Sequence, residues 1–457
     1  MTWPTPILPM AAPSSILVHI RETFALALPV MVSRAGMVVM ITVDSVMSGW
    51  AGANELAYYG IALAPQGTLL VIGFGLLLGT TVLTAQADGA GQRETCGRVW
   101  RLAMLLALIL GVADWAAASA GYDILLWLGQ DDHIAAGGGA TLRMFGSGMP
   151  AVLLFVATLC FLEGIGRPKP GMVVTLGANI LNVGLNWIMI FGHWGFPAMG
   201  APGAALATSI TRWAMFGALL LYVLTMPGHR RYGVRASLAG HYGLLRKMLR
   251  LGGPLALATG IESSAFSAAA IFAGWLGGIS LAGYQIAANV TVLAFMLAVG
   301  VSTATAVRVG NAVGRGDAGA VERAGWAGFG IIVAVMAIVA LALGMTRATV
   351  ASLFNGDPAV IAVAAGGLSV VAFMMIVDGL QCVLAGALRG VADTIVPSAI
   401  YGLSLWVVTV PATYFLGIRF GFGIEGLLWG LVAGLILACA LLGWRFHVVS
   451  RRPVRAM

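Results

Sequence analysis

The chain has 457 residues, of which 60% are hydrophobic and only 9% are charged, and its formal net charge is +8. A soluble domain carries roughly 25% charged residues, so this composition excludes a single soluble core. A membrane-spanning helix needs about 20 apolar residues, so the chain has room for about twelve such helices and little else. We therefore expect an all-α integral membrane protein without a soluble catalytic or nucleotide-binding domain.

Apolar segments separated by polar or glycine-rich stretches predict the spanning helices in chain order. In the first half the expected spans are 22–49, 55–86, 98–122, 137–162, 170–192 and 201–225. In the second half they are 247–275, 281–311, 322–345, 358–387, 395–417 and 423–446. No cleavable signal peptide is expected at the start, which lacks a basic region and is interrupted by prolines.

The basic residues gather in alternate loops. They follow the second, fourth, eighth and tenth spans and fill the central loop and the C-terminal end, as Arg93, Arg98, Arg101, Arg167, Lys169, Arg230, Arg231, Arg246, Lys247, Arg250, Arg315, Arg389, Arg445 and Arg451 show. This positive-inside bias predicts a multi-pass inner (plasma) membrane protein with both termini and the central loop in the cytoplasm. The positive charge then reflects orientation, and no nucleic-acid partner is expected.

The residues that would support bound metals or covalent catalysis are scattered. The cysteines show no CxxC or His-paired spacing, and the histidines fall at or outside the ends of the predicted helices. The sequence also lacks a phosphate-binding GxxxxGK[ST] loop and a GxSxG nucleophile motif. We expect no cofactor, no resident metal and no ATP hydrolysis, and the chain is not expected to be an enzyme.

The two halves of the sequence repeat each other. At an offset of 225 residues the repeat relates Pro29 to Pro254, Gly75 to Gly300, and Gly89-x-Gly91 to Gly314-x-Gly316; at 222 or 223 it relates Gly164 to Gly386, Arg167 to Arg389, and Gly200-x-x-Gly203 to Gly423-x-x-Gly426. This repeat predicts two pseudo-symmetric six-helix lobes, residues 1–235 and 236–457. Duplicated membrane bundles usually bind substrate between their halves, which favours a secondary transporter.

Carboxylates inside predicted spanning helices are the strongest candidates for function, because a charge in hydrocarbon is unfavourable. Glu262 lies 12 residues after Arg250, or roughly 18 Å from that surface at 1.5 Å per residue. Asp378 lies 11 residues before Arg389, or roughly 16 Å on the same scale. Both acids fall near the centre of a core about 30 Å thick, where they could share a proton or Na⁺. The alternative is that each is a hydrogen-bonded structural acid.

A second polar group is predicted in the first lobe. Asp44 lies near the outer end of the first span, and Asn182 and Asn186 share one face of the fifth. With Thr208 they form an oxygen-rich cluster of the kind that binds a hard cation. Polar side chains of this kind also hold membrane helices together, so a purely structural role is the alternative.

Other polar and helix-bending residues receive weaker assignments. By the repeat register Arg34 lies near the depth of Glu262, and we hypothesise that it neutralises a midplane acid in one conformation. Pro29 and Pro254 each interrupt the first span of a lobe and are candidate hinges. The remaining charges within the spans are expected to be helix-end or interhelical pairs: Asp114, Arg143, Glu163 and Arg212.

An ordered set of motifs resembles the multidrug and toxic compound extrusion (MATE) family, in its bacterial NorM-like branch. The similar stretches are Val43-Asp44-Ser45-Val46-Met47-Ser48-Gly49, Leu56-Ala57, Gly253-Pro254 with Glu262, Gly283-Tyr284-Gln285-Ile286-Ala287, Arg308-Val309-Gly310-Asn311, Asp378-Gly379-Leu380-Gln381 and Gly386-Ala387-Leu388-Arg389-Gly390. The resemblance implies a V-shaped bundle with a central cleft. It also implies export of amphipathic, often cationic, compounds in exchange for Na⁺ or H⁺.

The resemblance also implies roles for individual residues. Glu262 and Asp378 match the second-lobe acids used for cation coupling, and Asp44 matches the first-lobe acid. Gln285 and Gln381 belong to the motifs and are candidate cleft residues. Asn186 stands where several relatives carry aspartate, and Met374 where some carry tyrosine, so the coupling ion stays open between Na⁺ and H⁺. The expected partners are small drugs, other organic cations and membrane lipid, and a monomer is expected.

Three other readings of the sequence remain. A flippase for lipid-linked precursors, from the same superfamily, would carry extra helices and a strongly cationic cavity. An integral-membrane enzyme would need a nucleophile–base pair or a His/Asp cluster. A structural scaffold would not need acids near the midplane.

Overall fold

The computed structural model describes residues 16–234 and 242–452, and in these residues the secondary structure is helical, without strands. Eleven helices are long and apolar enough to cross a membrane, and the bent pair α5 and α6 makes a twelfth span. A helix satisfies its own backbone hydrogen bonds, which hydrocarbon cannot do. The chain is therefore an all-α, multi-pass membrane protein, as the sequence predicted.

The helices form two bundles. The first contains α1 (Ile16–Ala51), α2 (Ala53–Gly89), α3 (Arg93–Ser119), α4 (Gly121–Trp127), α5 (Asp132–Gly146), α6 (Met149–Gly164), α7 (Lys169–Phe191) and α8 (Gly200–Thr225), followed by the short η1 (His229–Tyr232). The second contains α9 (Tyr242–Trp275), α10 (Gly278–Arg315), α11 (Ala318–Phe354), α12 (Pro358–Gly390), α13 (Ile395–Tyr401), η2 (Gly402–Thr409), α14 (Val410–Tyr414), η3 (Phe415–Arg419) and α15 (Gly423–Ser450). Each predicted span contains a helix, and most helices extend a few residues beyond the prediction.

The predicted span 137–162 is the one that divides, into α5 and α6, which meet at 41°. Pro150 near the start of α6 cannot donate a backbone hydrogen bond, which favours a break there. Helix α8 supplies donors to carbonyls at this break. Ser209 Oγ donates to the Met144 carbonyl at 2.7 Å, and Trp213 Nε1 donates to the Ser147 carbonyl at 3.0 Å. The bend is therefore stabilised by a neighbouring helix.

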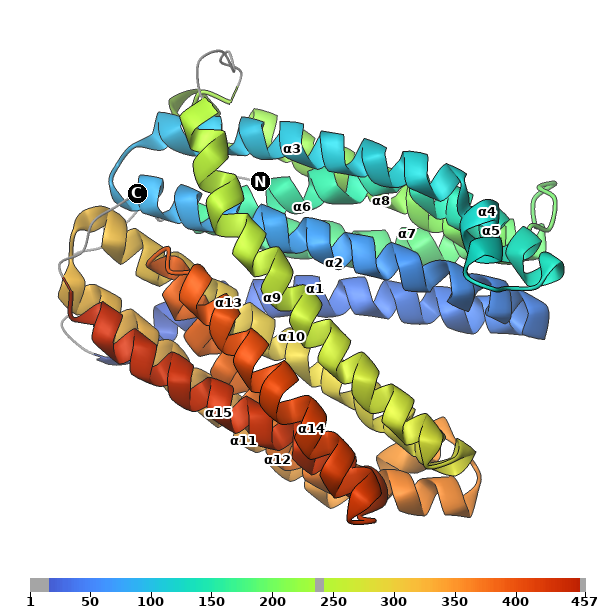
Figure 1. The fold of residues 1–457 in the computed structure, drawn as a ribbon. Helices are drawn as coiled ribbons and strands as arrows, with labels where there is room; N and C mark the ends of the chain where they lie inside the picture. The colour runs from blue at the N-terminus through green and yellow to red at the C-terminus, as the bar shows by residue number, and fades with distance from the viewer. Residues whose placement is uncertain (1–15, 235–241, 453–457) are drawn as a thin grey trace.

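The two bundles form a V (Figure 1). They meet at the end where α1 begins and α15 ends, which we call the terminus end, and they diverge towards the opposite end, where α4 lies, which we call the loop end. The seam between the lobes is formed mainly by α1 against α10 and by α2 against α9. These two helix pairs are equivalent under the sequence repeat, so the seam is pseudo-symmetric.

Glycines allow the helix backbones to touch across the seam. A Cβ atom on Gly75 would lie 2.6 Å from Ala256 Cα, and one on Gly300 would lie 2.9 Å from Met31 N. The same repeat offset separates Gly75 from Gly300 and Met31 from Ala256, so the two contacts are copies of each other. Nearer the terminus end, Gly89 meets Asn311 and Gly314 meets Gln86, again as a repeat-related pair.

Polar contacts close the terminus end of the seam. Arg308 of α10 donates to Glu22 Oε2 at 2.7 Å and to Thr23 Oγ1 at 2.8 Å, both on α1. Gln86 of α2 donates to the Gly390 carbonyl of α12 at 3.0 Å. The lobes are thus fastened at this end by an ion pair and hydrogen bonds as well as by close packing.

The apolar cores cross the predicted lobe boundary. Ala27 and Met31 of α1 pack in the core of the second lobe, whereas Met248 and Leu251 of α9 pack in a core of the first. The predicted boundary at residues 235 and 236 falls in the segment 235–241, outside the described residues. Each lobe therefore contributes the start of its first helix to the core of the other.

The Gly89 contact predicts a measurable effect on lobe closure. In Gly89→Ala the new Cβ would lie 2.7 Å from Asn311 Cα, so the lobes must separate at the terminus end. Spin labels placed at the start of α3 and the end of α10 should report a longer and broader distance distribution. Gly60→Ala is the matched control, because that glycine lies on α2 with no heavy atom within 4 Å of the new Cβ. Identical distributions for the two variants would contradict the proposed role of the contact.

Candidate functional site

Two second-lobe acids meet at one amide group. Gln381 of α12 donates from Nε2 to Glu262 Oε1 of α9 at 3.2 Å and to Asp378 Oδ1 at 3.0 Å. Asp378 and Gln381 are three residues apart and so lie on one face of α12. Tyr401 of α13 donates its hydroxyl to Gln381 Oε1. The structure therefore brings Glu262 and Asp378 together, and Gln381 is the residue that joins them.

Burial differs between the members of this acid pair. Asp378 is 3% exposed and Gln381 is fully buried, while Glu262 is half-buried. Met374, one turn before Asp378, is also buried and packs with the core of the second lobe. Within the described residues, no Lys or Arg lies at ion-pair distance from either acid. The pair thus holds two carboxylates with amide donors but without a fixed positive partner.

The first-lobe cluster is a closed hydrogen-bond network around Asp44. Asn186 Nδ2 donates to Asp44 Oδ1 at 2.6 Å and Thr208 donates to Oδ2. Asn182 accepts from Asn186 at 3.2 Å and donates to Thr208 at 3.2 Å. These four side chains, from α1, α7 and α8, are at most 2% exposed. All four residues predicted from the sequence are brought together.

Tyr59 is a member of this network that the sequence reasoning missed. Its hydroxyl donates to Asp44 Oδ2 at 3.3 Å from α2. The repeat held a signal for it, because Tyr59 corresponds to Tyr284, which also uses its hydroxyl to tie two helices by donating to the Phe266 carbonyl at 2.8 Å. Ser48 Oγ, one turn after Asp44, and Asn186 Oδ1 are buried without a hydrogen-bond partner among the described residues. These oxygens retain the capacity to accept a hydrogen bond or to ligate a cation.

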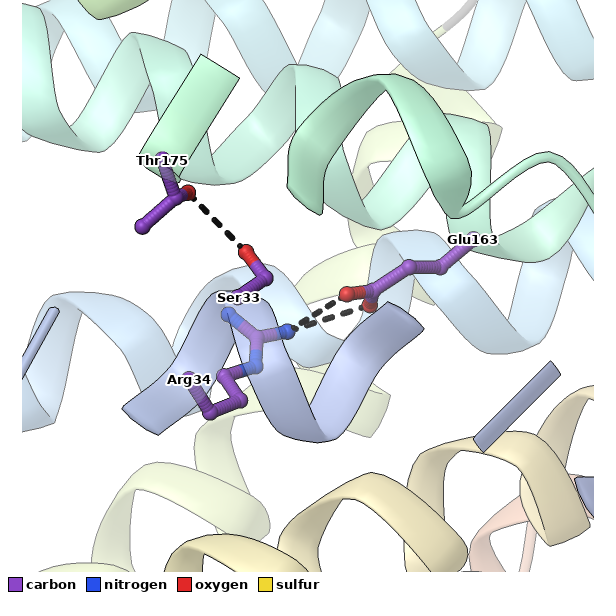
Figure 2. Close-up of polar contacts among 4 residues, drawn as sticks. All are labelled: Ser33, Arg34, Glu163 and Thr175. Atoms are coloured by element: carbon purple, nitrogen blue, oxygen red, sulfur yellow. Dashed lines mark hydrogen bonds and ion pairs between the residues drawn. The ribbon is translucent and has the colours of Figure 1, made fainter. Parts of the chain in front are cut away.

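Arg34 pairs with Glu163 rather than with a midplane acid. Its Nη2 lies 2.9 Å and 3.1 Å from the two oxygens of Glu163, and both side chains are at most 2% exposed. The two side chains point towards each other between α1 and α6, beside the Ser33–Thr175 hydrogen bond (Figure 2). The guanidinium carbon also lies 4.7 Å from the centre of the Phe74 ring. In this conformation the hypothesis that Arg34 neutralises Glu262 or Asp378 is therefore not met.

The remaining candidates lie outside these networks. Gln285 is exposed on α10, away from the hydrogen bonds that join the acid pair. Pro29 and Pro254 lie inside the continuous helices α1 and α9. Ser398 Oγ of α13 donates to the Pro254 carbonyl at 2.6 Å. Hinge motion at either proline stays a prediction.

Comparison with known proteins identifies the family. The MatE family model matches residues 29–188 and 254–415, which is one match in each lobe. The chain belongs to the MatE family. The two matched segments begin 225 residues apart, at the offset found in the sequence repeat.

Bacterial relatives match almost the whole chain. A probable multidrug resistance protein NorM from Caulobacter vibrioides is 33% identical over 453 residues, covering 99% of this chain and 96% of the relative. The multidrug resistance protein PmpM from Pseudomonas aeruginosa is 31% identical over 471 residues, covering 99% and 96%.

Solved structures show the same fold. A MATE transporter in the bent conformation has a TM-score of 0.86 at 19% identity, covering 96% of this chain and 98% of that one. An outward-facing multidrug resistance MATE family transporter has a TM-score of 0.86 at 20% identity, covering 97% and 100%.

The buried Arg34–Glu163 pair predicts strong, non-additive effects on stability. Arg34→Gln or Glu163→Gln alone leaves one buried charge without its partner, which costs about 3–5 kcal/mol. The double variant removes both charges and should lose much less than the sum of the single losses. Thermal unfolding of the three purified variants in detergent measures this difference. Additive losses would show that the two side chains do not act as a pair.

Proposed function

We propose that this chain is a secondary antiporter that exports amphipathic, cationic drugs or toxic compounds in exchange for H⁺ or Na⁺. The observation that carries the proposal is the Glu262–Asp378 pair, two carboxylates inside the membrane-spanning part of one lobe with no basic partner. Intramembrane acids of this kind commonly mark ion or proton pathways. The NorM and PmpM relatives, named as multidrug resistance proteins, support the same conclusion.

Coupling follows from charge. When the lobes are open at the loop end, an ion binds the acid pair and lowers the negative charge that holds a cationic drug, so the drug leaves. When the lobes open at the terminus end, the ion leaves and the restored carboxylates attract the next drug cation. The exchange needs only a difference in affinity between the two states. One elementary charge across 100 mV supplies about 2.3 kcal/mol.

The orientation of Gln381 favours H⁺ over Na⁺. Its NH₂ group faces both acids, while its oxygen accepts from Tyr401. A proton needs a single carboxylate oxygen, whereas a hard metal cation such as Na⁺ needs several oxygen ligands. Binding Na⁺ here would require the Gln381 amide to turn and its hydrogen bond with Tyr401 to break.

The distribution of basic residues supports an orientation in the inner membrane. The terminus end carries Arg93, Arg98, Arg230, Arg231, Arg315 and Arg451, whereas Asp123, Asp131, Asp132, Asp357 and Glu425 lie at the loop end. The positive-inside bias then places the terminus end in the cytoplasm. The V is closed at that end and would face outward. We propose that the chain works as a monomer within the lipid, without ATP.

The lipid-linked precursor flippase gains no support. Its substrate carries a diphosphate and would need free cations within the bundle. Arg34 is already engaged by Glu163, and the relatives that match the chain are named as multidrug resistance proteins.

Transport by purified protein tests the proposal. Proteoliposomes should export a fluorescent organic cation when a gradient of H⁺ or of Na⁺ is imposed, and the effective gradient identifies the ion. Asp378→Asn should abolish gradient-driven efflux, because the pair loses the carboxylate that binds the ion. Asp114→Asn on α3, a half-buried acid outside the site, should keep wild-type efflux. Absence of efflux by the wild type under both gradients would refute the antiporter.

Tyr401 is expected to orient Gln381. In Tyr401→Phe the Gln381 oxygen loses its donor, so the amide is no longer held with NH₂ towards the acids. A net hydrogen bond of about 1 kcal/mol corresponds to roughly a five-fold change in apparent ion affinity. Tyr414→Phe is the matched control, since that ring packs among Phe272 and Phe415. Equal ion-concentration dependence of efflux in both variants would exclude the orienting role.

A further inference from the structure

Arg212 lies beside the first-lobe acid network without being part of its hydrogen bonds. It follows Thr208 by one turn of α8, so the two side chains share a face of that helix. Thr208 donates to Asp44, and Arg212 is only 6% exposed. A buried guanidinium is therefore placed one helical turn from the hydroxyl that binds the acid.

The immediate surroundings of Arg212 are apolar. Its Nη1 lies 3.8 Å from Met149 Sδ, and its guanidinium carbon lies 5.7 Å from the centre of the Phe145 ring. The Phe145 ring packs edge-on against Tyr59, with centroids 5.4 Å apart, and Tyr59 donates to Asp44. Arg212 thus closes a small box of side chains around the carboxylate.

Asp44 is the carboxylate with which Arg212 interacts electrostatically. Among the described residues, no acid lies at ion-pair distance from Arg212. The titratable and charged groups at the network are Asp44 from α1, Tyr59 from α2 and Arg212 from α8, while α5, α6 and α7 contribute Phe145, Met149, Asn182 and Asn186. One negative and one positive charge therefore balance within the network.

The sequence repeat shows that this cation belongs to one lobe. At the offset that relates Gly200 to Gly423, Arg212 corresponds to Leu435, which is fully buried in the second-lobe core. The second-lobe acids Glu262 and Asp378 have no Lys or Arg at ion-pair distance among the described residues. The first lobe carries its own cation, and the second does not.

We propose that Arg212 is a built-in counter-cation of Asp44, so that the first-lobe acid stays balanced through the transport cycle and the coupling ion binds only at Glu262 and Asp378. A mobile cation at Asp44 would place a second positive charge beside a buried guanidinium, which repels it. The inference rests on the proposed function and assigns the coupling step to one lobe. It also replaces the expectation that Arg212 is a helix-end or interhelical structural residue.

The test compares Arg212→Gln, Asp44→Asn and the double variant, with Arg143→Gln as the control. Arg143 lies in the same lobe, on α5, and its side chain is exposed. The first measurement is the melting temperature in detergent, over a range of Na⁺ concentration and of pH. A ligand that binds the folded state raises this temperature. Arg212→Gln leaves Asp44 without a cation, so added Na⁺ or H⁺ should stabilise it several degrees more than the wild type.

This ion response separates a counter-cation from a structural arginine. A structural role would lower the melting temperature of Arg212→Gln without giving it a new dependence on the ion. Asp44→Asn and the double variant should show no added response, because neither retains the carboxylate. An Arg212→Gln response equal to that of wild type and Arg143→Gln would overturn the proposal, whether or not the wild type transports drugs.

The second measurement is gradient-driven efflux of the fluorescent cation. Asp44→Asn leaves Arg212 without a counter-charge and should lose at least ten-fold in rate, whereas the double variant should recover to within about three-fold of wild type. A folded double variant as inactive as Asp44→Asn would show that the carboxylate itself is needed for coupling, and would overturn the proposal. Failure of the wild type to transport would refute the proposed function instead and leave the melting-temperature test decisive for Arg212.

Discussion

Charged and polar groups inside this bundle must find partners within the protein, because the hydrocarbon around it offers none. The structure meets this requirement in three different ways. Arg34 and Glu163 form a direct buried ion pair. Asp44 is surrounded by neutral donors, with Arg212 nearby. Glu262 and Asp378 share the amide of one glutamine. The third arrangement leaves two carboxylates without a cation, which makes it the place where a transported ion has most to contribute.

The pseudo-symmetric seam and the asymmetric charges have separate tasks. Repeat-related contacts such as Gly75 with Ala256 and Gly300 with Met31 give both lobes the same surface for closure. The acids do not follow the repeat: at the same offset of 225 residues Asp44 corresponds to Ala269 and Glu262 to Met37. A symmetric seam can support opposite openings of the V, while an ion site in one lobe gives the cycle its direction of coupling.

Much of this architecture was predictable from the sequence. Apolar length predicted each span, because a helix must cross a core of fixed thickness. The division of 137–162 into α5 and α6 was not predicted, since the stability of that bend depends on Ser209 and Trp213 from a distant helix. The exchange of core residues such as Met31 and Met248 between lobes was also hidden, because composition does not reveal which helix faces which.

The sequence by itself determined the membrane class, the duplication and the identity of the unusual acids, since length, hydropathy and repeat spacing are local properties of the chain. It also grouped Asp44, Asn182, Asn186 and Thr208 correctly from helical spacing and depth. Only the tertiary structure decided the partners: Glu163 for Arg34, Gln381 between Glu262 and Asp378, and Tyr59 and Arg212 beside Asp44. Depth along a helix follows from residue number, but the direction in which a side chain points depends on how the helices rotate and pack.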